Sequence, residues 1–465
     1  MFRAIKRLLR PPSLSYCARP APASFLLPPI FGKQVDNSPA NRWIEYTENM
    51  ADYLKRVIDY EIAQVFPQLP ALCIAGAKGV GKTETAKRRA RTTYQLDQVD
   101  TRTILQADPQ LFLQQKPPVL LDEWQLLPET WDTVRRAVDD GARPESFLLT
   151  GSASPKPGVQ THSGAGRIVT LRMRPLTLSE RGIATPTVSL RDLFAGTEKI
   201  TGTSDLAASD YAEAICQTGL PGFQHLRGRA LRLSIDSYLR DVIDKDILTQ
   251  GYLTRTPHTL RAWLRSYAQA TATTASYAQI VEGATAGEGD KPSSETTRTY
   301  RDFLTKLWIL EPLEAWQPLG TGWKRLTSSP KHHLVDPGFA ARFLDLEATD
   351  LLRPGGGNIY GALFESLALL CVRVYAQALE ATVGHFRTRA GEHEVDLVLQ
   401  GRGGSLVALE VKTANRVGDH DVKHLVWLRE RAGEKMRAAA VLYGGKQAYM
   451  RKDGIAVIPL GCLGL

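Results

Sequence analysis

The sequence has few cysteines, no long apolar run and little excess charge outside its N-terminal segment. The five cysteines are far apart and form no CxxC pair, which excludes a zinc ribbon and a disulfide framework and favours the reducing cytoplasm. No apolar run approaches the ~18 residues that a membrane helix needs, so we expect no transmembrane segment and no membrane partner. At 465 residues, with 43% apolar and 23% charged residues, the composition is that of two or three globular domains.

The positive charge is concentrated at the N-terminus. Six basic residues and no acidic residue lie in the first 33 positions, and subtracting them from the net charge of +9 leaves +3. A mildly basic body permits nucleic-acid binding but does not require it. We interpret residues 1–44 as a disordered, proline-rich extension. This segment could lie upstream of the natural start, because Met50 opens the next helical segment. The alternative interpretation is an organelle transit peptide.

A Gly-rich loop in residues 76–83 carries the most specific motif. The apolar run ALCIA precedes GAKGVGKT, which matches G-x-x-x-x-G-K-[ST] between a strand and a helix. Glycines let backbone N–H groups surround a phosphate, and the N-terminus of the following helix attracts the same anion. We predict that Lys82 reaches the β- and γ-phosphates of ATP and that Thr83 holds Mg²⁺. The predicted nucleotide-binding residues are Gly76, Ala77, Lys78, Gly79, Val80, Gly81, Lys82 and Thr83.

An apolar strand that ends in two acidic residues follows about 40 residues later, in PPVLLDEWQ. Asp122 is predicted to bind Mg²⁺ through water, and Glu123 to orient or deprotonate the attacking water. A third strand, SFLLTGSAS, ends in polar residues that would sense the γ-phosphate. Arg167 follows a loop of small residues; it is either a transition-state finger, in cis or from a neighbouring subunit, or a surface arginine.

These motifs resemble the AAA-type ATPase domain found beside the family called DUF4143. The matching segments, in order, are GAKGVGKT, VLLDEWQ, FLLTGSAS, SGAGR and RPLTLSE, and the helix YLKRVIDYEIAQVF before the loop also fits. The resemblance implies an α/β chain with a P-loop, AAA-like ATPase domain at 45–185, a helical, winged-helix-like middle region at 186–350 and a nuclease-like domain at 351–465.

The middle region offers two interpretations. Residues 257–312 read as helix, helix, loop and helix, with Ser294 as the expected N-cap of the last one. This order suits a winged-helix-like unit whose recognition helix carries Thr297, Arg298, Arg301 and Lys306. A helical packing module with solvated basic residues fits equally well. Further on, SPKHHLVDPGFA resembles a family signature, but adjacent histidines in a strand face opposite ways, so His332 and His333 make a poor metal pair.

Residues 394–412, EVDLVLQGRGGSLVALEVK, predict a β-hairpin. Strand alternation places Val407, Leu409 and Val411 on one face and Ala408, Glu410 and Lys412 on the other. A tight turn at GRGG would bring Asp396 close to Glu410 and Lys412. Two carboxylates and an ammonium suit a Mg²⁺-dependent phosphodiesterase, and they also suit an ion-paired sheet edge.

The C-terminal segments look like the PD-(D/E)xK, restriction-endonuclease-like fold of the DUF4143 family. Glu365, in the first turn of the predicted helix GGGNIYGALFESLALLCVRVYAQALE, precedes Asp396, Glu410 and Lys412 in the required order. The resemblance implies that Asp396 and Glu410 bind Mg²⁺ with the Val411 carbonyl, that Glu365 completes the shell and that Lys412 stabilises the attacking hydroxide. The expected catalytic residues of the chain are therefore Glu123, Arg167, Asp396, Glu410 and Lys412; the expected metal ligands are Thr83, Asp122, Glu365, Asp396 and Glu410.

Two functions follow from these expectations. The first is a Mg²⁺-dependent ATPase coupled to a nuclease-like domain that acts on or binds DNA. The second is a nucleotide-dependent switch or assembly protein whose nuclease-like domain binds DNA or protein without cleaving. A toxin-like or defence role is a weaker third reading of either one. Expected cofactors are ATP and Mg²⁺, and expected partners are DNA and further copies of the chain.

Overall fold

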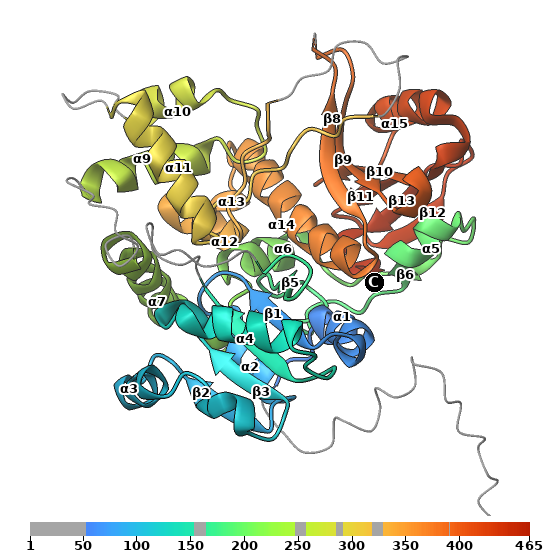
Figure 1. Ribbon diagram of the computed structural model, residues 1–465. Coiled ribbons are helices and arrows are strands. Elements are labelled where there is room, and N and C mark those ends of the chain that lie inside the picture. The colour runs from blue at the N-terminus through green and yellow to red at the C-terminus, as the bar shows by residue number, and fades with distance from the viewer. Residues whose placement is uncertain (1–52, 153–163, 247–256, 285–291, 319–328, 390) are drawn as a thin grey trace, which may run out of the picture. The chain divides into compact units, whose positions relative to one another are not determined.

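The computed structural model describes residues 53–152, 164–246, 257–284, 292–318, 329–389 and 391–465 (Figure 1). Asp52–Leu465 forms one compact unit. The predicted extension at 1–44 lies outside the described residues. The helix expected over YLKRVIDYEIAQVF is observed as α1, Val57–Val65, which starts four residues later than the predicted start.

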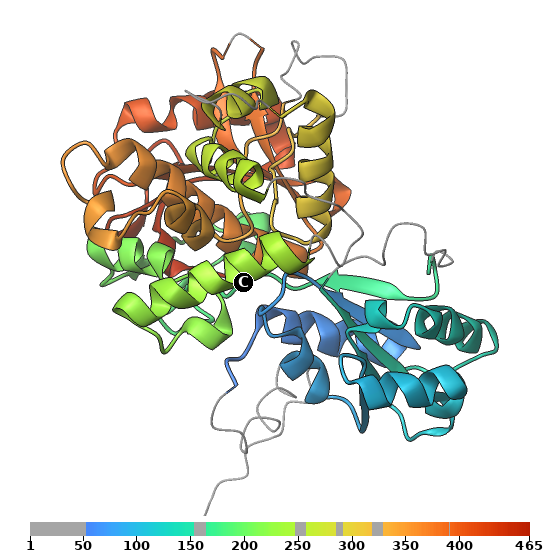
Figure 2. The same cartoon turned by 90° about the vertical axis from the view of Figure 1, so that its left-hand side faces the viewer.

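The first domain is built on a five-stranded parallel sheet with the order β2-β3-β4-β1-β5. Its central strands are continuous apolar runs because both of their faces are buried. The helices lie on both sides of the strands (Figure 2). The elements are α1, β1 (Ala71–Ala75), α2 (Lys82–Lys87), β2 (Thr92–Gln95), α3 (Val99–Ala107), β3 (Val119–Asp122), α4 (Glu129–Asp139), β4 (Phe147–Gly151) and β5 (Val169–Arg172). The predicted α/β class and P-loop strand–loop–helix order are confirmed.

The middle region is helical apart from two short strands. Its elements are β6 (Val188–Ser189), α5 (Leu190–Ala195), β7 (Gly202–Thr203), α6 (Ala208–Cys216), α7 (Gly228–Asp241) with a π-helix at Val242–Asp246, α9 (Pro257–Gln269), α10 (Tyr277–Ala284), α11 (Ser294–Lys306), α12 (Pro337–Phe343) and α13 (Ala348–Leu351). Strands β6 and β7 pair with strands of the C-terminal domain, so residues 188–203 belong structurally with that domain and not with the helices that follow.

The expected recognition helix, α11, differs from the prediction in two respects. Its N-cap is Ser293, whose hydroxyl accepts from the Thr296 N–H, and not Ser294. Thr297 is 4% exposed and donates its hydroxyl to the Ser294 carbonyl, so it cannot contact a ligand from this surface. Arg301 lies over the Tyr277 ring at 4.0 Å, while Arg298 remains exposed. Only part of the predicted basic face is therefore available.

The C-terminal domain contains a seven-stranded mixed sheet with the order β7-β12-β13-β11-β10-β9-β8. Helix α14 packs on one face and α15 on the other (Figure 1). The elements are α14 (Gly357–Ala378), β8 (Thr382–Arg387), β9 (Glu394–Gln400), β10 (Leu406–Lys412), α15 (Asp419–Ala432), β11 (Met436–Tyr443), β12 (Gln447–Met450), β13 (Ala456–Pro459) and β14 (Leu463–Gly464).

Helix α14 is the one described helix whose length and composition would suit a membrane span, and the sequence analysis did not single it out. In the folded protein, 72% of its most apolar 18-residue stretch is buried. Those side chains pack against the sheet and against α1, α6 and α12, as in the core helix of a folded domain. This buried helix also carries three polar residues, Glu365, Arg373 and Gln377.

Candidate functional site

The Gly-rich loop connects the end of β1 to α2. A Cβ added at Gly76 would lie 2.1 Å from the Met173 carbonyl oxygen, so only glycine fits beside the segment that follows β5. Lys82 is 3% exposed, and its ammonium donates to the Ala77 carbonyl at 2.9 Å, inside the loop. Burial lowers the pKa of this ammonium, while Glu123 and Asp122 oppose the shift. The predicted lysine thus lies at the centre of the predicted phosphate cradle.

Strand β4 lies between β1 and β3, and this order brings its polar end to the acidic pair. The Asp122 carboxylate accepts from the Thr83 hydroxyl at 2.8 Å and from the Thr150 hydroxyl at 2.5 Å. Burial raises the pKa of Asp122. A hydroxyl and a carboxylate are the oxygen ligands that Mg²⁺ takes with a nucleotide, so Thr83 and Asp122 fit a Mg²⁺–ATP site.

Glu123 is held directly beside Asp122. Its backbone is in the left-handed region, with φ of 57°, and its N–H donates to the Thr150 hydroxyl at 3.1 Å. The Glu123 carboxylate accepts from the Ser152 hydroxyl at 2.8 Å and from the Gln125 amide at 2.5 Å. Sequence reasoning identified Glu123 and the polar end of β4 but missed Gln125. These contacts fix the orientation of the expected general base.

No contact among the described residues joins Arg167 to the Gly-rich loop. Its guanidinium is 48% exposed and donates to the Asp139 carboxylate of α4 at 2.8 Å. The geometry within one chain therefore matches the surface-arginine alternative, and a role in cis is not supported.

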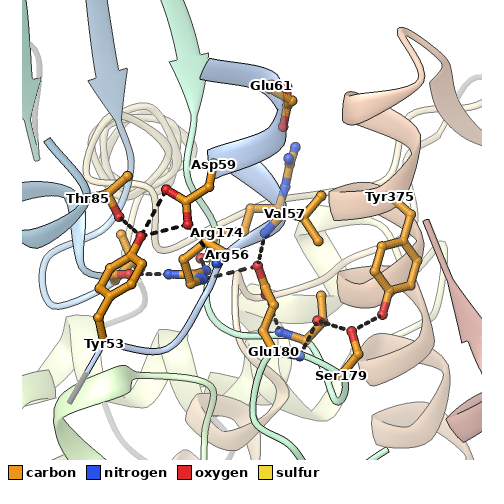
Figure 3. Close-up of polar contacts among 12 residues, drawn as sticks. Tyr53, Arg56, Val57, Asp59, Glu61, Thr85, Arg174, Ser179, Glu180 and Tyr375 are labelled. Carbon is orange, nitrogen blue, oxygen red and sulfur yellow. Dashed lines mark hydrogen bonds and ion pairs between the residues drawn. The ribbon is translucent and has the colours of Figure 1, made fainter. Parts of the chain in front are cut away.

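A buried arginine that sequence reasoning missed holds the loop to the segment after β5. Arg56, 5% exposed, donates to the Val80 carbonyl and to the Arg174 carbonyl, each at 2.7 Å, and to Glu180 at 3.1 Å (Figure 3). Tyr53 donates to Asp59 at 2.9 Å and shares a 2.8 Å hydrogen bond with Thr85 of α2. No local motif marks Arg56, because its partner Glu180 lies 124 residues away.

The side chain of Arg174 continues this network toward the C-terminal domain. Glu311, which is 6% exposed, accepts from Arg172 and Arg174 at 2.9 Å each and lies 3.5 Å from Arg373 of α14. Burial would raise the pKa of Glu311, but the three guanidinium groups lower it to about 2. Gln377 of α14 accepts from Arg174 at 2.8 Å and donates to the Arg172 carbonyl at 2.9 Å. A cavity of about 590 Å³, away from the P-loop, is lined by these residues.

The predicted hairpin in the C-terminal domain is present. Leu409 pairs with Leu397, and the same antiparallel register places Asp396 opposite Glu410. The Asp396 carboxylate accepts the Val411 N–H at 3.0 Å, and the Lys412 ammonium lies 3.0 Å from Glu410. The expected grouping of Asp396, Glu410 and Lys412 is thus formed. Val411 contributes its N–H to this grouping, a contact that the resemblance did not imply.

A lysine that sequence reasoning passed over lies within this acidic cluster. Lys331 is 2% exposed, and its ammonium lies 3.0 Å from Glu365, 3.1 Å from Glu394 and 2.9 Å from Asp396. Glu365 belongs to the third turn of α14, not the first, because the helix begins at Gly357. Lys331 stands beside the two histidines that were considered as ligands, so attention to charge as well as to metal-binding residue types would have flagged it.

The cluster does not fit Mg²⁺ as it stands. Among the described residues no group of three or more His, Cys, Asp or Glu side chains could hold a metal ion. The three expected ligands Glu365, Asp396 and Glu410 are instead paired with the Lys331 and Lys412 ammonium groups. The arrangement corresponds to the ion-paired alternative that the sequence left open.

Burial and neighbouring charges shift the pKa values of the carboxyl groups in this cluster in opposite directions. Burial, together with the charge of Asp396, raises the pKa of Glu365 to about 8 and raises that of Glu410 as well. Burial also acts to raise the pKa of Asp396, but Lys331 and Lys412 hold it below its usual range. The charges of the two lysines therefore favour the ionised form of Asp396 within this cluster.

Three family models match the chain in succession. One described as "AAA domain" matches residues 68–181, one described as "Domain of unknown function (DUF8612)" matches 208–350, and one described as "Domain of unknown function (DUF4143)" matches 360–463. The first and last confirm the resemblance stated from the motifs. The second was not anticipated; it spans the helices of the middle region.

Two curated relatives are similar over 313 residues at 25% identity. They are the uncharacterized protein Mb2031c of Mycobacterium bovis and the uncharacterized protein Rv2008c of Mycobacterium tuberculosis. The match covers 65% of this chain and 63% of each relative, so the chain spans less than two thirds of their length.

Two solved structures match the chain with low scores. The Walker-type ATPase PABY2304 of Pyrococcus abyssi matches at 13% identity with a TM-score of 0.37, covering 63% of this chain and 96% of that one. The Aeropyrum pernix ORC2 protein, in ADPNP–ADP complexes, matches at 15% identity with a TM-score of 0.28, covering 66% and 91%. Neither score reaches 0.5, so the strand order described above carries the fold assignment.

Proposed function

We propose that the chain, which matches an AAA-domain model at residues 68–181 and a DUF4143 model at 360–463, is an ATP-hydrolysing switch. In this proposal the nucleotide state of the P-loop is transmitted to the C-terminal domain, which binds DNA without cutting it. The observation that carries the ATPase half is the Asp122 carboxylate, which accepts from Thr83 of the P-loop and from Thr150 of β4.

The side chains around Asp122 divide the work of hydrolysis. Backbone N–H groups of the Gly-rich loop bind the phosphates, and Lys82 neutralises charge on the β- and γ-phosphates. Thr83 and Asp122 would hold Mg²⁺, and the ion would supply electrostatic stabilisation of the transferring group when bound. Glu123, oriented by Ser152 and Gln125, accepts the proton of the attacking water. Thr150 contacts both acidic residues and so responds to any shift between β3 and β4.

Coupling to the C-terminal domain follows a continuous set of buried polar contacts. Arg56 joins the Val80 carbonyl of the loop to the backbone of Arg174. The Arg174 side chain then joins Glu311 and Gln377, the latter on α14. A shift of the loop on nucleotide binding would act on these contacts, because charge-assisted hydrogen bonds are directional and strong. Helix α14 also carries Glu365, so one member of the acidic cluster lies on the element that the switch would move.

A second subunit would contribute Arg167. Its exposed position on the surface of the first domain suits an arginine finger that acts on a neighbouring copy. In addition to the C-terminal domain, DNA would meet the exposed basic residues of α11 in the middle region, Arg298 and Lys306. Both contacts are proposals that follow from exposure and charge.

Metal-dependent DNA cleavage is the second candidate function. The hairpin register supports it, because Asp396 lies opposite Glu410 and Lys412 follows on the same strand. The pairing of these carboxylates with lysines favours the switch instead.

A cleavage and binding assay tests the proposal. Supercoiled and linear DNA would be incubated with Mg²⁺ or Mn²⁺, with and without ATP, using wild type, Asp396→Ala and Lys82→Ala. We expect ATP turnover and salt-sensitive DNA binding that responds to nucleotide in the wild type, with no cutting in any condition. Cutting by the wild type that Asp396→Ala abolishes would establish the nuclease and overturn the non-cleaving proposal. Absence of ATP turnover with intact folding would refute the ATPase half.

A further inference from the structure

Lys331 is fixed in place by its backbone as well as by its ammonium. Its N–H donates to the Leu313 carbonyl at 2.9 Å, and its carbonyl accepts the Leu313 N–H at 2.8 Å. The side chain is therefore anchored on a short bridge outside the main sheet and is directed into the acidic cluster from there. A buried ammonium is tolerated only where carboxylates pair with it.

The three oxygen partners of Lys331 come from two different elements. Glu365 belongs to α14, and Glu394 and Asp396 belong to β9. Their oxygen atoms lie 2.9–3.1 Å from the Lys331 nitrogen, which is hydrogen-bond distance for an ammonium with three donors. Mg²⁺ requires oxygens at about 2.0–2.1 Å. A metal in this position would have to expel the ammonium and draw the oxygens inward by about 1 Å.

The remaining oxygens of the two hairpin acids also have partners. The second oxygen of Asp396 accepts the Val411 N–H at 3.0 Å. Glu410 is paired with Lys412 at 3.0 Å. Each Asp396 oxygen thus already has a donor in the folded chain, Lys331 on one side and the Val411 N–H on the other.

We propose that Lys331 is a built-in cation that takes the place of the divalent metal in the nuclease-like domain. The domain folds and works without a metal there, and the lysine is the element that keeps Mg²⁺ and Mn²⁺ out. Removing the ammonium while leaving space converts the cluster into a site for a hard divalent cation, because the oxygens of Glu365, Glu394 and Asp396 then lose their shared donor and surround the vacated space. This inference concerns the C-terminal domain and does not depend on ATP hydrolysis.

The test measures Mn²⁺ binding to the full chain in the absence of nucleotide. Electron paramagnetic resonance reports the concentration of free Mn²⁺, and the thermal unfolding midpoint reports stabilisation by the bound ion. Lys331→Ala is expected to bind one more Mn²⁺ per chain than wild type and to gain thermal stability when Mn²⁺ is added. The double variant Lys331→Ala/Asp396→Asn is expected to lose that extra ion. Lys331→Met, which removes the charge but fills the space, serves as the matched control and is expected to gain less.

Two results would overturn the inference. One is a folded Lys331→Ala chain that binds no more Mn²⁺ than wild type. The other needs no Lys331 variant and so holds even if that variant fails to fold: Mn²⁺ bound by the wild type and lost in Asp396→Asn. Equal Mn²⁺ binding by wild type and Asp396→Asn is the result that the inference expects.

Discussion

Lys82→Met is expected to abolish ATP binding and to reduce ATP hydrolysis by about 10²-fold or more. The substitution keeps most of the aliphatic stem of a side chain that is 3% exposed, and it deletes the ammonium that donates to Ala77 within the loop. The loss therefore reports the charge that meets the phosphates and not a packing defect. Binding would be measured with a fluorescent ATP analogue, and hydrolysis by phosphate release.

Two further variants sharpen this prediction. Lys116→Met removes an exposed lysine before β3, at the opposite end of the strand from Asp122, and is expected to leave both measurements unchanged. Glu123→Gln removes the general base and is expected to keep ATP binding while hydrolysis falls. Tight ATP binding by Lys82→Met, or full hydrolysis by Glu123→Gln, would contradict the assignment of the site.

Glu311→Gln is expected to lower the free energy of unfolding by about 3 kcal/mol or more. The carboxylate is 6% exposed and lies within 3.5 Å of three guanidinium groups, from Arg172, Arg174 and Arg373. Removing its charge leaves three partly buried cations without their shared counter-ion. Urea denaturation at neutral pH measures the loss. Glu380→Gln is the control, because its pair with Arg402 is exposed and is expected to change stability by about 0.5 kcal/mol or less.

The same variant has a pH dependence of known sign. The pKa of Glu311 falls from its ordinary 4.5 to about 2 in the folded protein, since the three arginines overcome the effect of burial. The unfolded chain therefore takes up this proton first, and the stabilisation from Glu311 is complete above pH 4.5 and lost as pH falls from 4.5 toward 2. The stability difference between wild type and Glu311→Gln should be constant near neutral pH and shrink below 4.5. A difference that grows on acidification would exclude this role.

The features that the sequence predicted correctly are those that depend on neighbouring residues. The Gly-rich loop follows β1 directly, and Asp122 and Glu123 end or follow a strand, so their order along the chain already implied their places. The hairpin partners Asp396 and Glu410 were predictable because strand alternation and one short turn set the register.

The features that were missed depend on contacts between distant parts of the chain. Lys331 meets Asp396 across 65 residues, and Arg56 meets Glu180 across 124. Nothing in the local pattern around either residue signals its partner, since a lone basic residue is usually exposed. Thr297 was misplaced for a related reason: helical spacing predicted the helix but not which face α11 buries.

Hydrogen exchange at the C-terminal end of α14 is the measurement that tests the switch most directly. The Glu123→Gln chain would be compared with and without Mg²⁺–ATP, and peptides covering residues 371–380 would be followed. We expect ATP to change exchange in these peptides, and we expect Arg174→Gln, which loses the contacts with Glu311 and Gln377, to suppress that change. Arg402→Gln, which alters only an exposed ion pair, should preserve it. A change confined to the P-loop and β3, with α14 unaffected in a chain that binds ATP, would contradict coupling between the two domains.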